Sequence, residues 1–231
     1  MAYKLLNLYQ LKGNIKMDDI QISHDGQSIR FKNQTHTNKW FEQSSYSENW
    51  KERSEKLVDM FLKNEYLENI SYKVAEYGCG PYAPVFSLFN EKYGFNVDKY
   101  DIKKWDEDTK ILNLNILSNT IPKVNISIFS GVLEYLDNVP STLSKVMTNS
   151  DYIIMSYAYL PSTFFLDENK YMSEIYRRAV TNGWRNHYTN KELVEIFSKV
   201  GVISAVGSWN KKHSLFLLRN FNIDKNNLLE K

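Results

Sequence analysis

Two glycines separated by a single residue follow a short apolar run in VAEYGCGPYAP, residues 74–84. The chain has only 9 glycines in 231 residues, so Gly78 and Gly80 form a local concentration. Glycines at the carboxyl end of a parallel strand permit a tight turn and let backbone amides approach a ligand closely. Glu76, which precedes the first glycine by two residues, would attract a cationic or amino group. The stretch therefore predicts a cradle for a positively charged ligand.

The same turn also fits the dinucleotide-binding pattern Gly-x-Gly-x-x-Ala over residues 78–83. Pro81 and Pro84 broaden the turn and remove amide donors that a diphosphate would use. A short-chain dehydrogenase would also need a Tyr-x-x-x-Lys pair on a helix beside its cofactor. That spacing occurs only from Tyr100 to Lys104, next to the second expected strand. An oxidoreductase is therefore the weaker alternative.

Short apolar runs alternate with amphipathic ones from residue 72 onward, which predicts an α/β fold with a parallel sheet and helices on its faces. The last two strands, joined by a tight turn at residues 210–213, must be antiparallel. Thr189 and Glu192 have the capping-box spacing of a helix start. Helices are expected at residues 83–94, 139–147 and 189–201. Strands are expected at residues 72–78, 95–102, 109–116, 124–131, 151–159, 202–209 and 214–221.

The N-terminal part of the chain differs in composition from the rest. Residues 1–43 are polar, and apolar residues alternate there on either side of an Asp-Gly turn at residues 25–26, which predicts a small β-hairpin. Residues 44–231 are interpreted as the main domain. A helix with Ser45 and Glu48 in capping-box spacing is expected at its start.

These features together resemble the class I S-adenosylmethionine-dependent methyltransferases, whose first motif is an acidic residue followed by x-Gly-x-Gly-x-Gly. Glu76, Gly78 and Gly80 match that motif, and Tyr82 stands where the third glycine would be. The resemblance covers about residues 45–220. It implies a Rossmann-like, seven-stranded, mostly parallel sheet with an antiparallel last strand. It also implies S-adenosylmethionine as the cofactor, held by the acidic residue and both glycines.

The resemblance extends to three further cofactor contacts. In the family, an acidic residue that ends the second strand binds the ribose hydroxyls; Asp101 fits this role, and Asp98 is the competing choice. The family places Asp or Asn near the adenine amino group after the third strand, where Asn115 stands. Ser130, after the fourth strand, is the remaining expected contact.

Residues 129–135, FSGVLEY, resemble the family segment Phe-x-x-x-hydrophobic-Glu-His, with tyrosine in place of histidine. Glu134 and Tyr135 would therefore lie where open α/β sheets bind ligands, on the acceptor side of a catalytic site. The methyl donor is already activated, so a general base is optional, but histidine suits that role for a hydroxyl acceptor. His187 is the expected base, because the family fold would place its segment over the cofactor.

Two further stretches are expected to wall the site. Residues 167–184 have helical period between the fifth strand and the last helix, and are interpreted as a lid or substrate wall. Aromatic residues that gather ahead of the first strand would form a wall for the sulfonium or a sugar ring, or else cover the sheet edge. They are Trp40, Phe41, Tyr46 and Trp50.

Composition narrows the possible partners. The formal net charge is +2 from 29 basic and 27 acidic residues. No long stretch concentrates the basic residues as a nucleic-acid-binding groove would require, so nucleic-acid binding is not expected. The single cysteine, Cys79, excludes an intrachain disulfide, and no run of about 18 apolar residues predicts a membrane span. The acidic run at residues 106–108 is expected to be a solvated loop and no metal ligand set. A cytoplasmic location is expected.

The expected function is methyl transfer from S-adenosylmethionine to a hydroxyl of a sugar or glycan, of the kind found in bacterial surface polysaccharides. Methylation of a small metabolite is the second hypothesis. A catalytically degenerate binding subunit is the third, because Tyr82 replaces the third glycine and Tyr135 replaces the histidine.

Overall fold

The structure is a computed structural model that describes residues 20–22, 29–31, 41–42, 46–47, 50–65, 72–116 and 118–223. Several expected features lie outside these residues. They are the Asp-Gly turn at residues 25–26, the Ser45–Glu48 pair and Trp40.

Seven strands form one sheet in the order β5-β4-β3-β6-β7-β9-β8. All neighbours in this sheet are parallel except β9, which runs antiparallel to both β7 and β8. This arrangement confirms the predicted α/β, Rossmann-like, seven-stranded fold. The strands are β3 (Lys73–Tyr77), β4 (Asn96–Asp101), β5 (Lys110–Ile111), β6 (Val124–Phe129), β7 (Ser150–Tyr157), β8 (Val202–Trp209) and β9 (His213–Arg219). The predicted N-terminal hairpin is confirmed in its strands, β1 (Ile20–Ile22) and β2 (Ile29–Phe31), which pair antiparallel.

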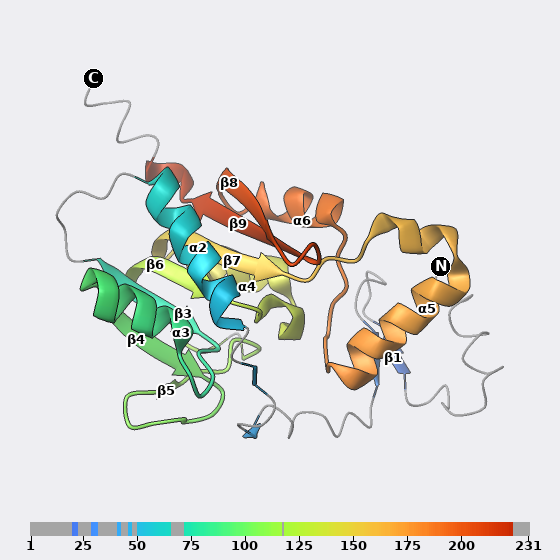
Figure 1. The fold of residues 1–231 in the computed structure, drawn as a ribbon, viewed down its shortest axis with the longest axis horizontal. Coiled ribbons are helices and arrows are strands. Elements are labelled where there is room, and N and C mark those ends of the chain that lie inside the picture. Colours follow the sequence, from blue (N-terminus) through green and yellow to red (C-terminus); the bar gives the residue numbers. More distant parts are fainter. Residues whose placement is uncertain are drawn as a thin grey trace.

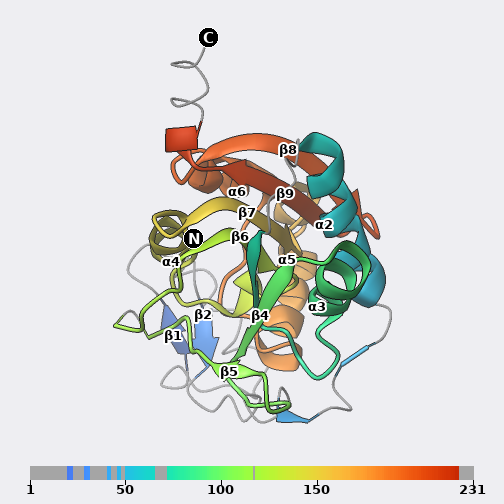
Figure 2. The same cartoon turned by 90° about the vertical axis from the view of Figure 1, so that its left-hand side faces the viewer.

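Helices cover both faces of the sheet (Figures 1 and 2). On one face, Phe61 of α2 and Phe89 of the π-helix η4 are fully buried against the sheet. On the other face, Leu143 of α4 and Phe197 of α6 are fully buried in a second apolar cluster. The helices are α2 (Trp50–Asn64), α3 (Pro84–Phe86), η4 (Ser87–Lys92), η5 (Leu133–Tyr135), α4 (Val139–Met147), η6 (Ser162–Leu166), α5 (Glu168–Tyr176), η7 (Arg177–Thr181) and α6 (Asn190–Phe197). The two layers leave the carboxyl ends of β3, β4 and β6 open for a site.

The predicted strand at residues 109–116 is wrong in its length, because only β5 pairs with β4. The amide of Leu112 still donates to the Asp101 carbonyl at 2.8 Å, but the ladder stops there. The Asn113 side chain accepts a hydrogen bond from the Asn115 amide at 3.0 Å and closes a local turn. Asparagine side chains compete with strand pairing in this way, so the segment leaves the sheet as a loop.

Residues 167–184, here called the insertion, are helical from Glu168 to Thr181, as their period predicts, and residues 182–184 leave the helix. The Asp167 side chain accepts from the Lys170 amide at 3.1 Å and starts α5, which continues into η7. In Figure 1 the insertion lies beyond the ends of β6 and β7, on the side where the strand arrows point. It therefore stands over the carboxyl edge of the sheet.

Candidate functional site

The glycine turn after β3 has the shape that the sequence predicts. Gly78 and Gly80 have φ of 66° and 61°, in the left-handed region that favours glycine. A Cβ on Gly78 would lie 2.5 Å from Val132 Cγ2, and one on Gly80 would lie 2.5 Å from Tyr46 Cε1. Both positions therefore need glycine for conformation and for space.

Glu76, in β3, connects this turn to the helix that follows it. Its carboxylate accepts hydrogen bonds from the Val85 amide at 3.2 Å and the Phe86 amide at 2.8 Å, where the following helix begins. The side chain is 2% exposed, and burial raises its pKa to about 8. Although Glu76 also lines the cavity described below, its hydrogen bonds show that it ties the turn to the helix.

Asp101 ends β4 beside the glycine turn. Its Oδ2 accepts from the Gly80 amide at 2.9 Å, and its Oδ1 accepts from the Ile102 amide at 2.7 Å. Burial raises the pKa of this carboxyl. Asp98, the competing choice, lies on the same strand but does not line the cavity among the described residues, and it pairs with Lys110 at 2.7 Å. The geometry therefore favours Asp101 as the ligand-facing carboxylate.

Asn115 and Ser130 both line the cavity and are both held by neighbouring loops. The Asn115 amide nitrogen donates to the Tyr135 carbonyl at 3.1 Å, and its oxygen accepts from the Asp137 amide at 2.7 Å. The Ser130 hydroxyl accepts from Arg53 Nε at 3.1 Å, and its carbonyl accepts from Arg53 Nη2 at 2.9 Å. These two residues therefore fix the loops that follow β5 and β6.

Glu134 lies in η5 and lines the cavity described below. Its Oε1 accepts from the Ala158 amide at 2.7 Å, while Oε2 is buried with no hydrogen-bond partner among the described residues. Burial raises its pKa, and the nearby Arg53 and Arg178 oppose that shift. The next residue, Tyr135, accepts a hydrogen bond at its hydroxyl from Trp184 Nε1 at 2.9 Å. This contact joins the insertion to η5, the short helix after β6.

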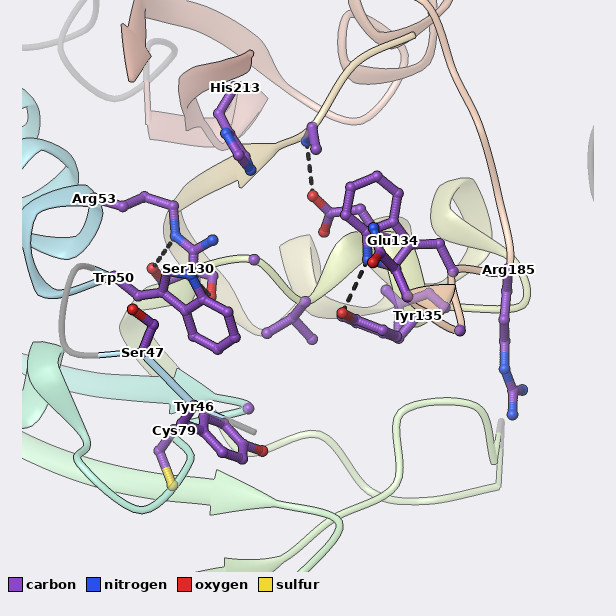
Figure 3. A pocket seen from close by; sticks show the side chains of 18 of the residues that line it. Tyr46, Ser47, Trp50, Arg53, Cys79, Ser130, Glu134, Tyr135, Arg185 and His213 are labelled. Atoms are coloured by element: carbon purple, nitrogen blue, oxygen red, sulfur yellow. Dashed lines mark hydrogen bonds between the residues drawn. The ribbon is translucent and has the colours of Figure 1, made fainter. Parts of the chain in front are cut away.

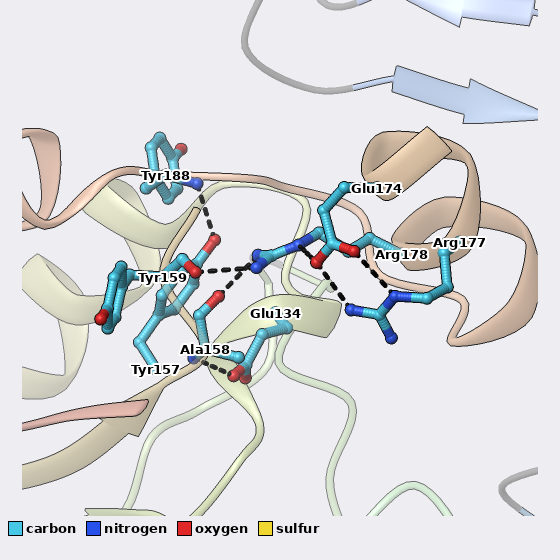
Figure 4. Close-up of polar contacts among 8 residues, drawn as sticks. All are labelled: Glu134, Tyr157, Ala158, Tyr159, Glu174, Arg177, Arg178 and Tyr188. Carbon is cyan, nitrogen blue, oxygen red and sulfur yellow. Dashed lines mark hydrogen bonds and ion pairs between the residues drawn. The ribbon is translucent and has the colours of Figure 1, made fainter. Parts of the chain in front are cut away.

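Arg178 anchors the insertion to the end of β7 (Figure 4). Its Nε donates to Glu174 at 2.8 Å, and its Nη1 and Nη2 donate to the carbonyls of Ala158 and Tyr159, both at 2.7 Å. The side chain is 4% exposed, so these bonds are shielded from water. Because buried, charge-assisted hydrogen bonds are strong, the insertion is held in place over the strand ends.

His187 is not placed as a general base. It does not line the cavity among the described residues, burial lowers its pKa to about 3, and neither ring nitrogen has a partner among them. The flanking residues explain this: Tyr157 donates to Asn186 at 2.6 Å and accepts from the Tyr188 amide at 2.9 Å. These bonds hold the segment so that its histidine turns inward. The cavity instead contains His213, at the start of β9.

One cavity of about 1160 Å³ lies at the carboxyl edge of the sheet, and Gly80 and His187 are not among the described residues that line it. The predicted site residues that do line it are Glu76, Gly78, Asp101, Asn115, Ser130, Glu134 and Tyr135. Its lower wall is the glycine turn with Tyr46 and Cys79, and Arg53 and Ser130 close one side (Figure 3). Tyr135 lies opposite them, and the insertion forms the far wall. The cavity thus joins the predicted cofactor residues to the predicted acceptor side. Of the predicted aromatic wall, Phe41, Tyr46 and Trp50 line it.

Three residues of the site were not singled out from the sequence: Arg53, Arg178 and His213. Arg53 could have been identified from the sequence, because its spacing from Trp50 and Leu57 places a charged residue on the apolar face of α2. The other two depend on how the insertion and the β8–β9 hairpin fold back over the sheet, which local patterns do not encode.

The described part of the chain has neither a metal-binding cluster nor a membrane-spanning helix. It contains no group of three His, Cys, Asp or Glu side chains that could hold a metal ion. None of its helices is long and apolar enough to cross a bilayer.

No protein-family model and no curated protein sequence matches this chain. Its fold is similar to that of an O-methyltransferase family 2 protein from Planctomyces limnophilus in complex with apigenin, with a TM-score of 0.59 and 10% identity over 82% of this chain and 63% of that one. Human N-acetylserotonin methyltransferase in complex with S-adenosylmethionine gives a TM-score of 0.55 and 12% identity over 80% of this chain and 56% of that one. A protein from Pyrococcus horikoshii gives a TM-score of 0.50 and 15% identity over 75% and 92% of the two chains.

The chain thus spans less than two thirds of the length of the first two of these proteins. The similarity confirms the class I methyltransferase fold that the motifs predict.

Proposed function

We propose that this protein transfers a methyl group from S-adenosylmethionine to a hydroxyl of a small acceptor, with a sugar or glycan as the acceptor. The observation that carries the proposal is the single cavity that joins the glycine turn to a buried carboxyl group with an unpartnered oxygen. Residues of a cofactor cradle and a carboxyl group that could accept a proton therefore line the same cavity.

The residues present fit the cofactor. Gly78 lines the cavity, and a Cβ on Gly78 or Gly80 would collide with Val132 or Tyr46, two side chains that also line it. Asp101 would accept the ribose hydroxyls, because its oxygens have lone pairs beyond those that the backbone amides use. Glu76 and Asp101 also place two carboxyl groups at the end of the cavity where a cationic ligand would enter the turn.

S-adenosylmethionine supplies an already activated methyl group, so the protein has to align the acceptor and exclude water. The bond from Trp184 to Tyr135 and the anchoring of Arg178 hold the insertion as the wall that excludes water. As the acceptor oxygen takes the methyl group, Glu134 Oε2 would take the hydroxyl proton. Its raised pKa suits this role, since a carboxyl group of ordinary pKa is a weaker base.

A calorimetric titration with S-adenosylmethionine and S-adenosylhomocysteine tests the cofactor site. We expect micromolar binding to the wild type and a loss of about tenfold or more in Asp101→Asn, because the amide has no second acceptor oxygen for the Gly80 and Ile102 amides and the ribose. Asp98→Asn, on the same strand but outside the described cavity lining, is the matched control and should bind normally. No binding to the wild type would refute the proposal and favour the binding-subunit or dinucleotide hypotheses.

A planar phenolic acceptor is the second candidate, because the similar protein from Planctomyces limnophilus is in complex with apigenin and aromatic side chains line the cavity here. Transfer of a labelled methyl group to a sugar panel and to a phenol panel, analysed by mass spectrometry, separates the two. Transfer to phenols alone would refute the sugar acceptor.

A further inference from the structure

Basic side chains outnumber acidic ones around the cavity. Among the described residues that line it, six are Lys or Arg and four are Asp or Glu. Two of the acidic residues, Glu76 and Asp101, lie at the glycine turn and accept hydrogen bonds from backbone amides. The basic residues are Lys51, Arg53, Arg177, Arg178, Arg185 and Lys212. The basic residues of the cavity therefore come from α2, from the insertion and Arg185 after it, and from the β8–β9 turn.

The remaining carboxylates do not balance this charge. Glu174 is shared between Arg177, at 2.7 Å, and Arg178, at 2.8 Å. Glu134 accepts a hydrogen bond only from a backbone amide, and it forms no ion pair with a cation of the cavity among the described residues. Lys212, in the turn between β8 and β9, has no ion-pair partner among the described residues. At least one cation therefore faces the cavity without a counter-ion.

His213 reports the same positive potential. Its ring lies 4.8 Å from the Trp209 ring, and its Nδ1 is buried with no hydrogen-bond partner among the described residues. Burial and then Arg53, Arg178 and Lys212 lower its pKa to about 4. These three cations come from α2, the insertion and the hairpin turn, so the positive charge that acts on the imidazole has three separate sources. In Figure 3 the Arg53 and His213 side chains lie on the same side of the cavity.

The proposed cofactor would increase this imbalance. S-adenosylmethionine has a sulfonium, an ammonium and one carboxylate at neutral pH, so it brings one net positive charge into the cavity. Like charges in a partly desolvated site repel more strongly than in water. An acceptor with a negative charge would relieve that repulsion, whereas a neutral acceptor would leave it.

We infer that the acceptor carries an anionic group, a carboxylate or a phosphate, which binds beside His213 between Lys212 and Arg178. This inference rests on the proposed function and narrows its acceptor to an acidic or phosphorylated molecule. Lys212, in an exposed turn, provides the charge that is available for the ligand, while Arg178 contributes from the anchored end of the insertion. The neutral His213 would provide a hydrogen bond.

Inorganic phosphate and acetate are probes that test the anion site without knowledge of the whole acceptor. Each is titrated into the protein saturated with S-adenosylhomocysteine, at constant ionic strength maintained with sodium chloride. We expect one of them to bind in the millimolar range, and the one that binds identifies the group on the acceptor. Binding should be tighter in the S-adenosylmethionine complex, because the sulfonium attracts the anion and the coupling is reciprocal.

Lys212→Glu should weaken anion binding by about tenfold or more, since it replaces an attraction by a repulsion. Lys211→Glu is the matched control: it is adjacent in the same turn, changes the charge equally, and does not line the described cavity. Anion binding no better than chloride, or equal weakening in both variants, would overturn the inference. A failure to bind S-adenosylhomocysteine would instead refute the proposed function, and titration of the ligand-free protein would still test the anion site.

Discussion

Replacing Gly80 by alanine tests whether the glycine turn is shaped for a ligand. Gly80 and Gly94 have similar backbone conformations, with φ of +61° and +70°, so an alanine at either position costs about 1 kcal/mol in backbone strain. Their surroundings differ. A Cβ on Gly80 would lie 2.5 Å and 2.9 Å from two atoms of the Tyr46 ring, whereas nothing lies within 4 Å of a Cβ on Gly94.

Gly94→Ala should therefore show the strain alone, a decrease in Tm of about 2–4 °C for a chain of this size. Gly80→Ala should show the same strain and also displace Tyr46 by about 1 Å to restore van der Waals distance. Tyr46 packs edge-on against Trp50 and Trp105, with ring centroids 5.8 Å and 5.3 Å apart, so its shift would move the cavity wall. We expect the affinity for S-adenosylhomocysteine to fall by about tenfold, or about 1.4 kcal/mol.

Thermal unfolding and calorimetric titration of both variants provide the measurement. The reasoning predicts a Tm for Gly80→Ala at or below that of Gly94→Ala, and a loss of affinity in Gly80→Ala alone. Equal affinities in Gly80→Ala and Gly94→Ala would refute it, because the turn would then accept a side chain without any consequence for the ligand.

Two further predictions concern buried titratable groups. Glu134→Gln retains an oxygen for the Ala158 amide but no proton acceptor, so methyl transfer should fall by about 10²–10⁴-fold while cofactor binding stays within about threefold; unchanged transfer would exclude Glu134 as the base. His187 has a folded pKa of about 3, below its ordinary value of 6.5, so its contribution to stability is present above pH 6.5 and is lost as the pH falls toward 3. His187→Phe should therefore reduce the difference between the free energies of unfolding at pH 7 and pH 5, measured by urea unfolding. If this difference is the same in the variant and the wild type, the burial of a neutral histidine is contradicted.

Local patterns predicted most of the architecture. The apolar runs and the glycine pair are short-range signals, and the sheet order with its antiparallel last strand follows from them through the family resemblance. The capping box of α6 is a clear case: the Thr189 side chain accepts from the Glu192 amide, and the Glu192 side chain accepts from the Thr189 amide. Such contacts lie within a single turn, so spacing alone specifies them.

The contents of the site depended on contacts that spacing does not specify. His187 and His213 both lie next to expected elements, and the sequence offered no reason to prefer the second. The difference arises because Tyr157, 30 residues away in the chain from His187, holds its neighbours and turns it inward. The shortened β5 has a similar origin, since the side chain of Asn113 competes with a ladder that the apolar pattern favours.

Glu76 and Asp101 show why a motif does not by itself reveal a binding residue. The resemblance assigns both carboxylates to the cofactor, yet in the structure each accepts backbone amides at the turn, where helix α3 begins or where Gly80 bends. A carboxylate that shapes the turn would be required even if it never touched a ligand. Loss of binding in a Glu76 variant would therefore not distinguish these roles. The same holds for Asp101, because its variant would disturb the bond from the Gly80 amide as well as any ligand contact. The comparison of Gly80 with Gly94 isolates the effect of the turn, because the two glycines share a positive φ and differ in whether a Cβ would reach the Tyr46 side chain.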